Sequence, residues 1–221
     1  CETIYLHLNW IVTYIMKTDY LNKALEIVRN EVSGRGKSPE FGSLKYFLGV
    51  SNNISQSEVI RFGRKMEQWW SYIAEEKFTI LDSGVQCING DENKDIDLIL
   101  GDDDNKIIYY YELKSNIQLD SEKQRATKTK VENVVSHLKK VWKGYTIEYG
   151  ILFWSIFNND DVSAGKGAIQ YFINNGIPIV YPEDYFNLIG DDISSEEYYE
   201  FGRKLGEEIK NGQYWYKKSR R

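Results

Sequence analysis

Cysteine, histidine and proline are all scarce in this sequence. Its 221 residues include only 2 Cys, 2 His and 3 Pro. Cys1 and Cys87 cannot form a disulfide framework, which fits a reducing cytoplasm, and their scattered spacing to the two histidines argues against a zinc site. With little proline and no long Ser/Gly-rich run, the chain shows no linker. We therefore expect one globular protein.

Long apolar runs are also missing. No stretch approaches the roughly 18 to 20 apolar residues that a membrane-spanning helix needs, and "IYLHLNWIVTYIM" contains His7 and Asn9, which favours a packed helix. The start lacks the basic residues and cleavage site of a signal peptide, and a chain that begins at Cys1 rather than Met suggests missing residues before it. We expect a cytoplasmic protein that makes no membrane contact.

The charge of the chain is acidic overall and unevenly distributed. A formal net charge of -5 argues against general coating of nucleic acid, but it allows a local basic cleft. Between residues 115 and 143 there are seven bases against three acids. A polar helix expected at 120–143 would carry the candidate DNA contacts Lys123, Arg125, Lys128 and Lys130. The alternative is that these bases form an ordinary solvated helix face.

Hydrophobic periodicity predicts an alternation of helices and strands. Helices are expected within 4–32 and at 55–77, and the glycine-rich segment 33–43 between them is expected to be a loop. This loop contains "GRGKS", but Glu31 stands where a phosphate-binding loop needs glycine, and a helix rather than a strand precedes it. The sequence then predicts strands at 78–88, 95–100 and 106–115, a helix at 120–143, a strand at 145–157, a helix at 164–176, a strand at 177–184 and a helix at 194–212 that stops at Asn-Gly.

This order predicts an α/β fold with a mixed central sheet flanked by helices. The first three strands are expected to form an antiparallel meander, because turn-rich segments join them. We expect residues 1–54 to be an N-terminal helical segment packed on a core formed by 55–221, with one structural domain overall.

The chemistry is concentrated at the end of the strand "KIIYYYELKSN". Side chains alternate along a strand, so Tyr110, Glu112 and Lys114 share one face. The neighbouring strand brings Asp97, which directly precedes the apolar "LIL". Two nearby carboxylates can hold Mg²⁺, which polarises a phosphodiester and activates water, and an ammonium group stabilises charge on the phosphate oxygens.

These residues resemble the motif of the PD-(D/E)xK nucleases, and among them the type II restriction endonucleases. The pattern is an acid on one strand, here Asp97, followed by (D/E)-x-K on the next, here Glu112 and Lys114. Glu67 in "GRKMEQWW" matches a glutamate that often supports the metal site of that family. The family's proline before the first acid is Ile96 here. Asp95 on the same strand face is the alternative first ligand, and we prefer Asp97 because the apolar strand follows it directly.

The resemblance implies a restriction-endonuclease-like core over about 55–190 and Mg²⁺-dependent cleavage of double-stranded DNA at a short specific sequence, leaving a 5′-phosphate. Asp97 and Glu112 would hold the metal, and Lys114 and Glu67 would complete the catalytic site. Two-fold symmetric DNA sites would favour a homodimer. The alternatives are a DNA repair or junction-resolving nuclease of the same fold, and a non-catalytic DNA-binding module in which Glu112 and Lys114 form a surface ion pair.

Overall fold

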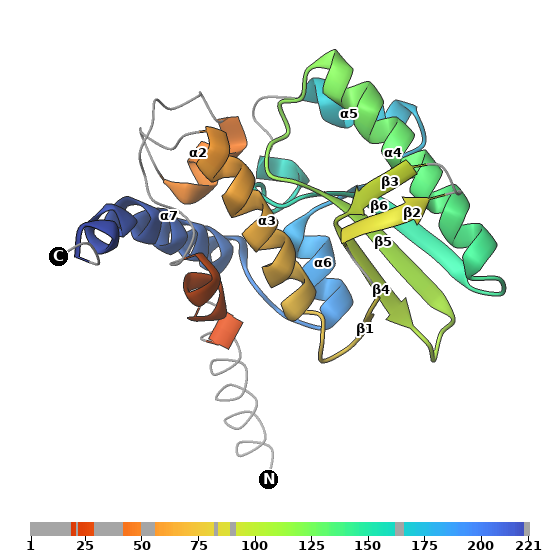
Figure 1. Cartoon of the computed structure of the whole chain (residues 1–221), viewed down its shortest axis with the longest axis horizontal. Helices are drawn as coiled ribbons and strands as arrows, with labels where there is room; N and C mark the ends of the chain where they lie inside the picture. Colours follow the sequence, from red (N-terminus) through yellow and green to blue (C-terminus); the bar gives the residue numbers. More distant parts are fainter. Residues whose placement is uncertain are drawn as a thin grey trace, which may run out of the picture.

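A mixed five-stranded sheet lies at the centre of the molecule (Figure 1). The computed structural model describes residues 19–20, 22–28, 42–49, 56–81, 84–88, 92–161 and 166–218. The sheet has the order β1-β4-β5-β6-β7, formed by Thr79–Ile80, Leu98–Asp102, Ile107–Lys114, Thr146–Phe153 and Ile179–Val180. The strands β1, β4 and β5 pair antiparallel, whereas β5, β6 and β7 run parallel. The predicted α/β fold with a mixed sheet is confirmed.

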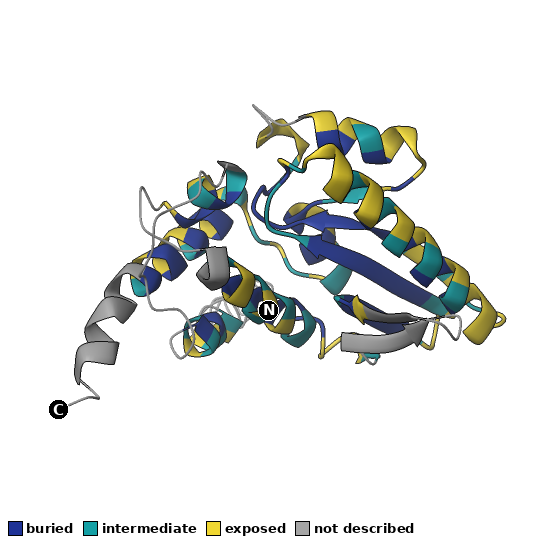
Figure 2. Cartoon of the chain, turned by 45° about the horizontal axis from the view of Figure 1, so that its top comes forward, coloured by how far each residue is buried: buried dark blue, intermediate teal, exposed yellow. Residues whose placement is uncertain are grey.

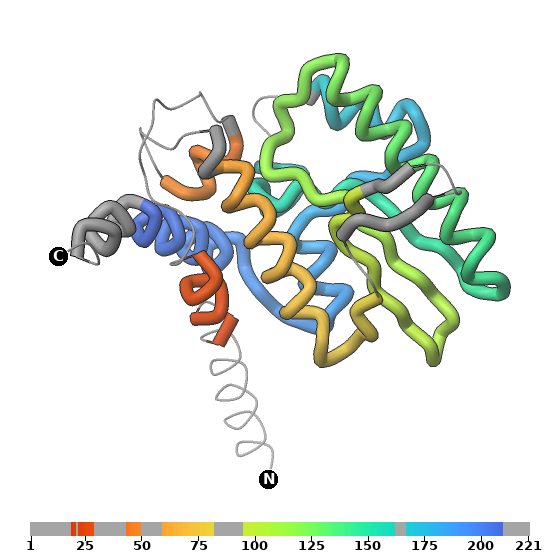
Figure 3. The backbone as a smooth tube through the Cα atoms, viewed as in Figure 1, coloured from red at the N-terminus to blue at the C-terminus, as the bar shows by residue number. Residues whose placement is uncertain are grey.

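The central strands are rich in residues that suit a buried sheet. β5 reads IIYYYELK, and six of its eight residues, Ile108 to Leu113, are buried. Because β5 and β6 are parallel, the chain must cross over between them, and α4 (Ser121–Val141) makes this connection (Figure 3). Asp120 caps α4, since its carboxylate accepts a hydrogen bond from the Lys123 N–H at 2.8 Å.

Helices cover both faces of the sheet. On one face α4 and α5 (Lys166–Asn174) pack on a core that includes Tyr110, Val131 and Phe172. The other face packs against α3 (Gln56–Tyr72), α6 (Pro182–Ile189) and α7 (Ser195–Lys218), with Trp70 of α3 at the centre of that core. In Figure 2 the central strands are buried, while the outward faces of the helices are exposed.

The N-terminal helical part belongs to the second of these cores. Residues 19–20 and 22–28 are helical, and Ala24 and Val28 are buried among the residues of α3 and α7. A short helix, α2 (Gly42–Leu48), also packs there through Phe47. The rest of the predicted 4–32 helices and most of the predicted 33–43 loop lie outside the described residues. Among the described residues, no helix combines the length and apolar character that crossing a membrane requires.

The predicted three-stranded meander is wrong in one respect. The segment 78–88 forms two strands, β1 in the central sheet and β2 (Gly84–Ile88), and the next segment divides at Asp97 into β3 (Glu92–Ile96) and β4. β2 and β3 pair antiparallel in a separate two-stranded sheet. The antiparallel β4–β5 hairpin is as predicted. Periodicity shows where a chain is extended but not which strands it pairs with, and so it missed this division.

Several helices also differ from the prediction, and α3 ends at Tyr72 rather than at residue 77. α2 begins at Gly42, inside the predicted loop. The predicted strand at 177–184 is only Ile179–Val180 and gives way to α6, where Pro182 opens the helix and the Tyr181 N–H donates to the Asp184 carboxylate at 2.8 Å. α7 continues through Asn211 and Gly212 to Lys218. A glycine inside a helix costs only about 1 kcal/mol, so the Asn-Gly pair does not force a stop.

Candidate functional site

Asp97 lies at the break between β3 and β4, and its carboxylate completes the end of the β4–β5 ladder. The pairing of β4 with β5 ends at Leu98 and Tyr111. Beyond that point the chain before Asp97 belongs to the β2–β3 sheet. The Leu113 N–H of β5 donates instead to Asp97 Oδ2 at 2.8 Å. At Asp97 the chain passes from the two-stranded sheet into the central sheet. The Asp97 carboxylate takes the place of a backbone carbonyl as the acceptor for the Leu113 N–H, and this hydrogen bond fixes the carboxylate beside β5.

Glu112 is the most deeply buried charged group of the site. As the strand alternation predicts, Tyr110, Glu112 and Lys114 share one face, and their polar atoms contact one another. Lys114 Nζ lies 2.6 Å from Glu112 Oε1, and the Tyr110 hydroxyl donates to Glu112 Oε2 at 3.1 Å. The side chain of Glu112 is 1% exposed and that of Lys114 is 25% exposed. The pair is therefore not the surface ion pair of the non-catalytic alternative.

Lys130, which lies on the helix α4, contacts both carboxylates. Its Nζ lies 2.6 Å from Glu112 Oε2 and 3.0 Å from Asp97 Oδ1. The sequence suggested Lys130 as a DNA contact on the helix surface, whereas the structure directs its ammonium into the site. The sequence holds a partial signal: Lys130 stands four residues before the apolar Val134, and residues at this spacing lie on one helix face, but the spacing does not show which residues that face contacts.

The electrostatics of the site follow from burial and from the two ammonium groups. Burial, and next the charge of Glu112, raise the pKa of Asp97 to about 6. Burial alone would also raise the pKa of Glu112, but the ammonium groups of Lys114 and Lys130 outweigh it and hold that pKa below its ordinary value. Two neighbouring acids with pKa values displaced in opposite directions are typical of functional sites.

Glu67 approaches the same site from α3. Burial raises the pKa of its carboxyl to about 7, and the charges of Asp97 and Asp95 add to the effect. The ammonium groups of Lys114 and Lys130 act in the opposite sense. The charges of Asp97, Asp95, Lys114 and Lys130 therefore all act on the Glu67 carboxyl. Asp95 is exposed, whereas the carboxylate of Asp97 is held by Leu113 and Lys130, and this difference favours Asp97 over Asp95 as the first ligand.

The donor set of Asp97 and Glu112 fits Mg²⁺. Within the described part of the chain, no three Asp, Glu, His or Cys side chains converge as a ready-made metal site. Mg²⁺ does not need three, because one or two carboxylates, with waters and substrate phosphate, commonly hold it. Asp97 Oδ1 and Glu112 Oε2 both face one cationic atom, Lys130 Nζ, and so they converge on one point. Hard carboxylate oxygens at such a point suit Mg²⁺ or Mn²⁺.

The other candidate DNA contacts remain on the outer side of α4. Lys123 and Arg125 are exposed, and Lys128 is partly exposed. Lys123 pairs with Asp120 at 3.0 Å and Lys128 with Glu132 at 2.7 Å. Exposed ion pairs of this kind are weak and readily exchange partners, so they leave these side chains available to phosphate.

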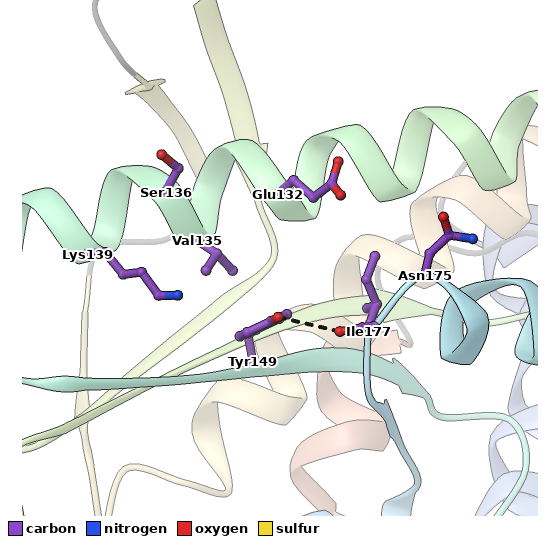
Figure 4. Close-up of a pocket in the computed structure, with 8 residues that line it drawn as sticks. Glu132, Val135, Ser136, Lys139, Tyr149, Asn175 and Ile177 are labelled. Carbon is purple, nitrogen blue, oxygen red and sulfur yellow. Dashed lines mark hydrogen bonds between the residues drawn. The ribbon is translucent and has the colours of Figure 1, made fainter.

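A separate hollow of about 330 Å³ lies between α4, β6 and the turn after α5 (Figure 4). Glu132 and Lys139 of α4 line one side, and Tyr149 and Asn175 line the other. The Tyr149 hydroxyl donates to the Gly176 carbonyl at 3.5 Å (Figure 4). None of the residues of the Asp97 site lines this hollow, and its single acid, Glu132, is paired with Lys128. Its lining therefore offers no pair of carboxylates for a metal.

Comparisons with known proteins give no independent assignment. The chain matches no protein-family model and no curated protein sequence. The chemistry of the site therefore has to be inferred from its own residues.

Proposed function

We propose that this protein is a Mg²⁺-dependent endonuclease of the PD-(D/E)xK class, which hydrolyses phosphodiester bonds of double-stranded DNA at a short specific sequence and leaves a 5′-phosphate. The observation that carries the proposal is the meeting of Asp97, Glu112 and Lys114 at one end of the central strands, where β4 begins and β5 ends. These are the residues that the motif requires. A helix before the strands, an antiparallel hairpin and a parallel strand after a crossover helix also suit a restriction-endonuclease-like core.

Each side chain has a distinct task in this proposal. Asp97 and Glu112 would hold Mg²⁺, which when bound polarises the scissile phosphate and lowers the pKa of water. Lys114 is partly exposed beside Glu112, so its ammonium can approach a phosphate and stabilise the negative charge that grows on the phosphorus oxygens. Glu67, with a pKa near 7, can accept or share a proton near neutral pH on the α3 side of the site.

DNA binding is assigned to the helix after the catalytic strand. The exposed bases Lys123 and Arg125 and the partly exposed Lys128 lie on α4, the helix that also supplies Lys130 to the site. A phosphate backbone that follows α4 would bring one phosphate to Asp97 and Glu112. Cutting both strands with one such site per chain favours a homodimer whose two-fold axis matches that of the DNA sequence.

The test is digestion of phage or genomic DNA by the purified chain with Mg²⁺. A specific endonuclease gives discrete fragments with 5′-phosphate ends, and the Glu112→Gln variant gives none. A nuclease that acts on junctions or damaged DNA would leave these substrates intact and cut a four-way junction or a mismatched duplex instead. DNA that stays intact on every substrate while the protein binds it would favour the non-catalytic module.

A further inference from the structure

The oxygens of the site are already divided among fixed partners. Asp97 Oδ2 accepts from the Leu113 N–H, and Glu112 Oε1 pairs with Lys114 Nζ at 2.6 Å. The remaining two oxygens, Asp97 Oδ1 and Glu112 Oε2, are the pair that faces a common point. Lys130 Nζ contacts both of them, at 3.0 and 2.6 Å, and the Tyr110 hydroxyl also donates to Glu112 Oε2 at 3.1 Å. A metal ion shared by the two carboxylates would need the same two oxygens.

Lys130 is held in this position by its place on α4. The neighbouring Val131 is fully buried, and Thr127 one turn earlier is also buried, so this part of the helix is fixed against the sheet. The Lys130 side chain is only 20% exposed. Its ammonium lies within ion-pair distance of both Asp97 and Glu112.

We propose that Lys130 is a resident cation that competes with the divalent metal ion for Asp97 and Glu112. This inference rests on the proposed function, and it adds a regulation of the same site. In the absence of metal, the Lys130 ammonium neutralises the two carboxylates and keeps them together. Metal and ammonium are both cations and need the same oxygens, so loading the site requires Lys130 to leave them. The site is thereby stable when empty of metal, and it loads only at a higher concentration of the ion than two unpaired carboxylates would need.

The experiment measures metal affinity without any DNA. Mn²⁺, which suits the same oxygen ligands, is titrated into the full chain, and the electron paramagnetic resonance signal of the free ion reports how much remains unbound. Lys130→Gln removes the competing charge and keeps a hydrogen-bond donor. The matched control is Lys139→Gln, which makes the same change at an exposed position of α4. We expect Lys130→Gln to bind Mn²⁺ at least about tenfold more tightly than wild type, which corresponds to about 1.4 kcal/mol, and the control to be unchanged.

A second variant and a second measurement guard against a folding defect. Lys130→Arg keeps the positive charge and should bind Mn²⁺ no more tightly than wild type. In EDTA, Lys130→Gln should melt at a lower temperature than wild type and should be stabilised more by added Mn²⁺.

The competition would be overturned if wild type binds Mn²⁺ and Lys130→Gln binds it equally or less tightly. The metal site itself would then remain. A gain in affinity for Lys130→Arg as large as that for Lys130→Gln would also overturn the competition. Failure of wild type and both variants to bind Mn²⁺ would also overturn the competition, because no metal ion would then contend with Lys130 for these oxygens. The proposed function is decided separately, by the digestion of DNA with Mg²⁺, where substrate phosphate can complete the metal site.

Discussion

Asp97→Asn should stabilise the folded protein near neutral pH while it abolishes cleavage. Asp97 has a pKa near 3.8 when it is exposed in the unfolded chain, and burial and the charge of Glu112 raise it to about 6 in the folded protein. Below pH 3.8 the carboxyl is neutral in both the folded and the unfolded chain, and its burial then carries no cost of burying a charge. The folded protein loses this relative stability as the pH rises through about 6, where the buried carboxyl becomes charged. Above that pH, the charged carboxylate makes the fold less stable than a neutral group would.

The size of the effect follows from the pKa difference. A difference of about 2 corresponds to about 3 kcal/mol at pH 7 to 8. Asparagine can still accept the hydrogen bond from the Leu113 N–H, but its amide nitrogen would face Lys130, which should reduce the gain to about 1 to 2 kcal/mol. For a chain of this size, that gain raises the melting temperature by roughly 2 to 8 °C.

The assay is thermal melting in EDTA at several pH values between 4 and 8, with Asp95→Asn as the control. Asp95 is exposed two residues earlier, so its substitution should change the melting temperature little. The advantage of Asp97→Asn over wild type should grow from pH 4 to pH 7 and then level off. A variant that is less stable than wild type at pH 8 would refute the reasoning. Asp97 would then have a structural role, as the acceptor that holds the end of β5 through the Leu113 N–H.

Three further outcomes are expected. Glu67→Gln should raise the melting temperature in EDTA at pH 8 but not at pH 4. Burial raises the pKa of Glu67 to about 7, so its charged form opposes folding only above that pH. An equal change in melting temperature at both pH values would contradict this. Replacing all three of Lys123, Arg125 and Lys128 by Ala should weaken DNA binding and reduce its salt dependence. Fluorescence anisotropy at several salt concentrations measures both, and an unchanged dependence of affinity on salt would mean that DNA binds elsewhere. Excess EDTA should abolish cleavage and Ca²⁺ should support binding without efficient cutting, as seen on gels; undiminished cutting in EDTA would remove the two-carboxylate hypothesis.

The sequence predicted most of the sheet because its strands have strong local patterns. The segment from Ile107 to Lys114 alternates faces around buried tyrosines, and the helix α4 lies close to its expected bounds. The strand β6 begins one residue after its expected start but ends at Phe153 rather than at residue 157. The division of the chain at Asp97 could not be read in this way, because strand pairing depends on contacts between residues far apart in the chain. The helix α6 was missed because "YPED" was included in a strand, although proline followed by acids is a typical helix start.

The candidate site could be predicted only where the motif is local. Glu112 and Lys114 are two residues apart on one strand, so their shared face follows from alternation alone. Lys130 comes from another element, and its role depends on how α4 rotates against the sheet. The raised pKa of Glu67 likewise depends on burial between α3 and the sheet edge, which the sequence does not specify.

The most direct test of the account is single-turnover cleavage of a bound cognate duplex by wild type and by Lys114→Ala, with Lys139→Ala as the control and thermal melting in parallel. Glu112 keeps Lys130 as a partner when Lys114 is removed, so the fold should tolerate the change. We predict that Lys114→Ala melts and binds DNA like wild type but cuts on the order of 10²-fold more slowly or worse, because the ammonium acts on charge that appears in the transition state. Cleavage by Lys114→Ala at the wild-type rate would contradict the assignment of the Glu112–Lys114 strand as the catalytic element.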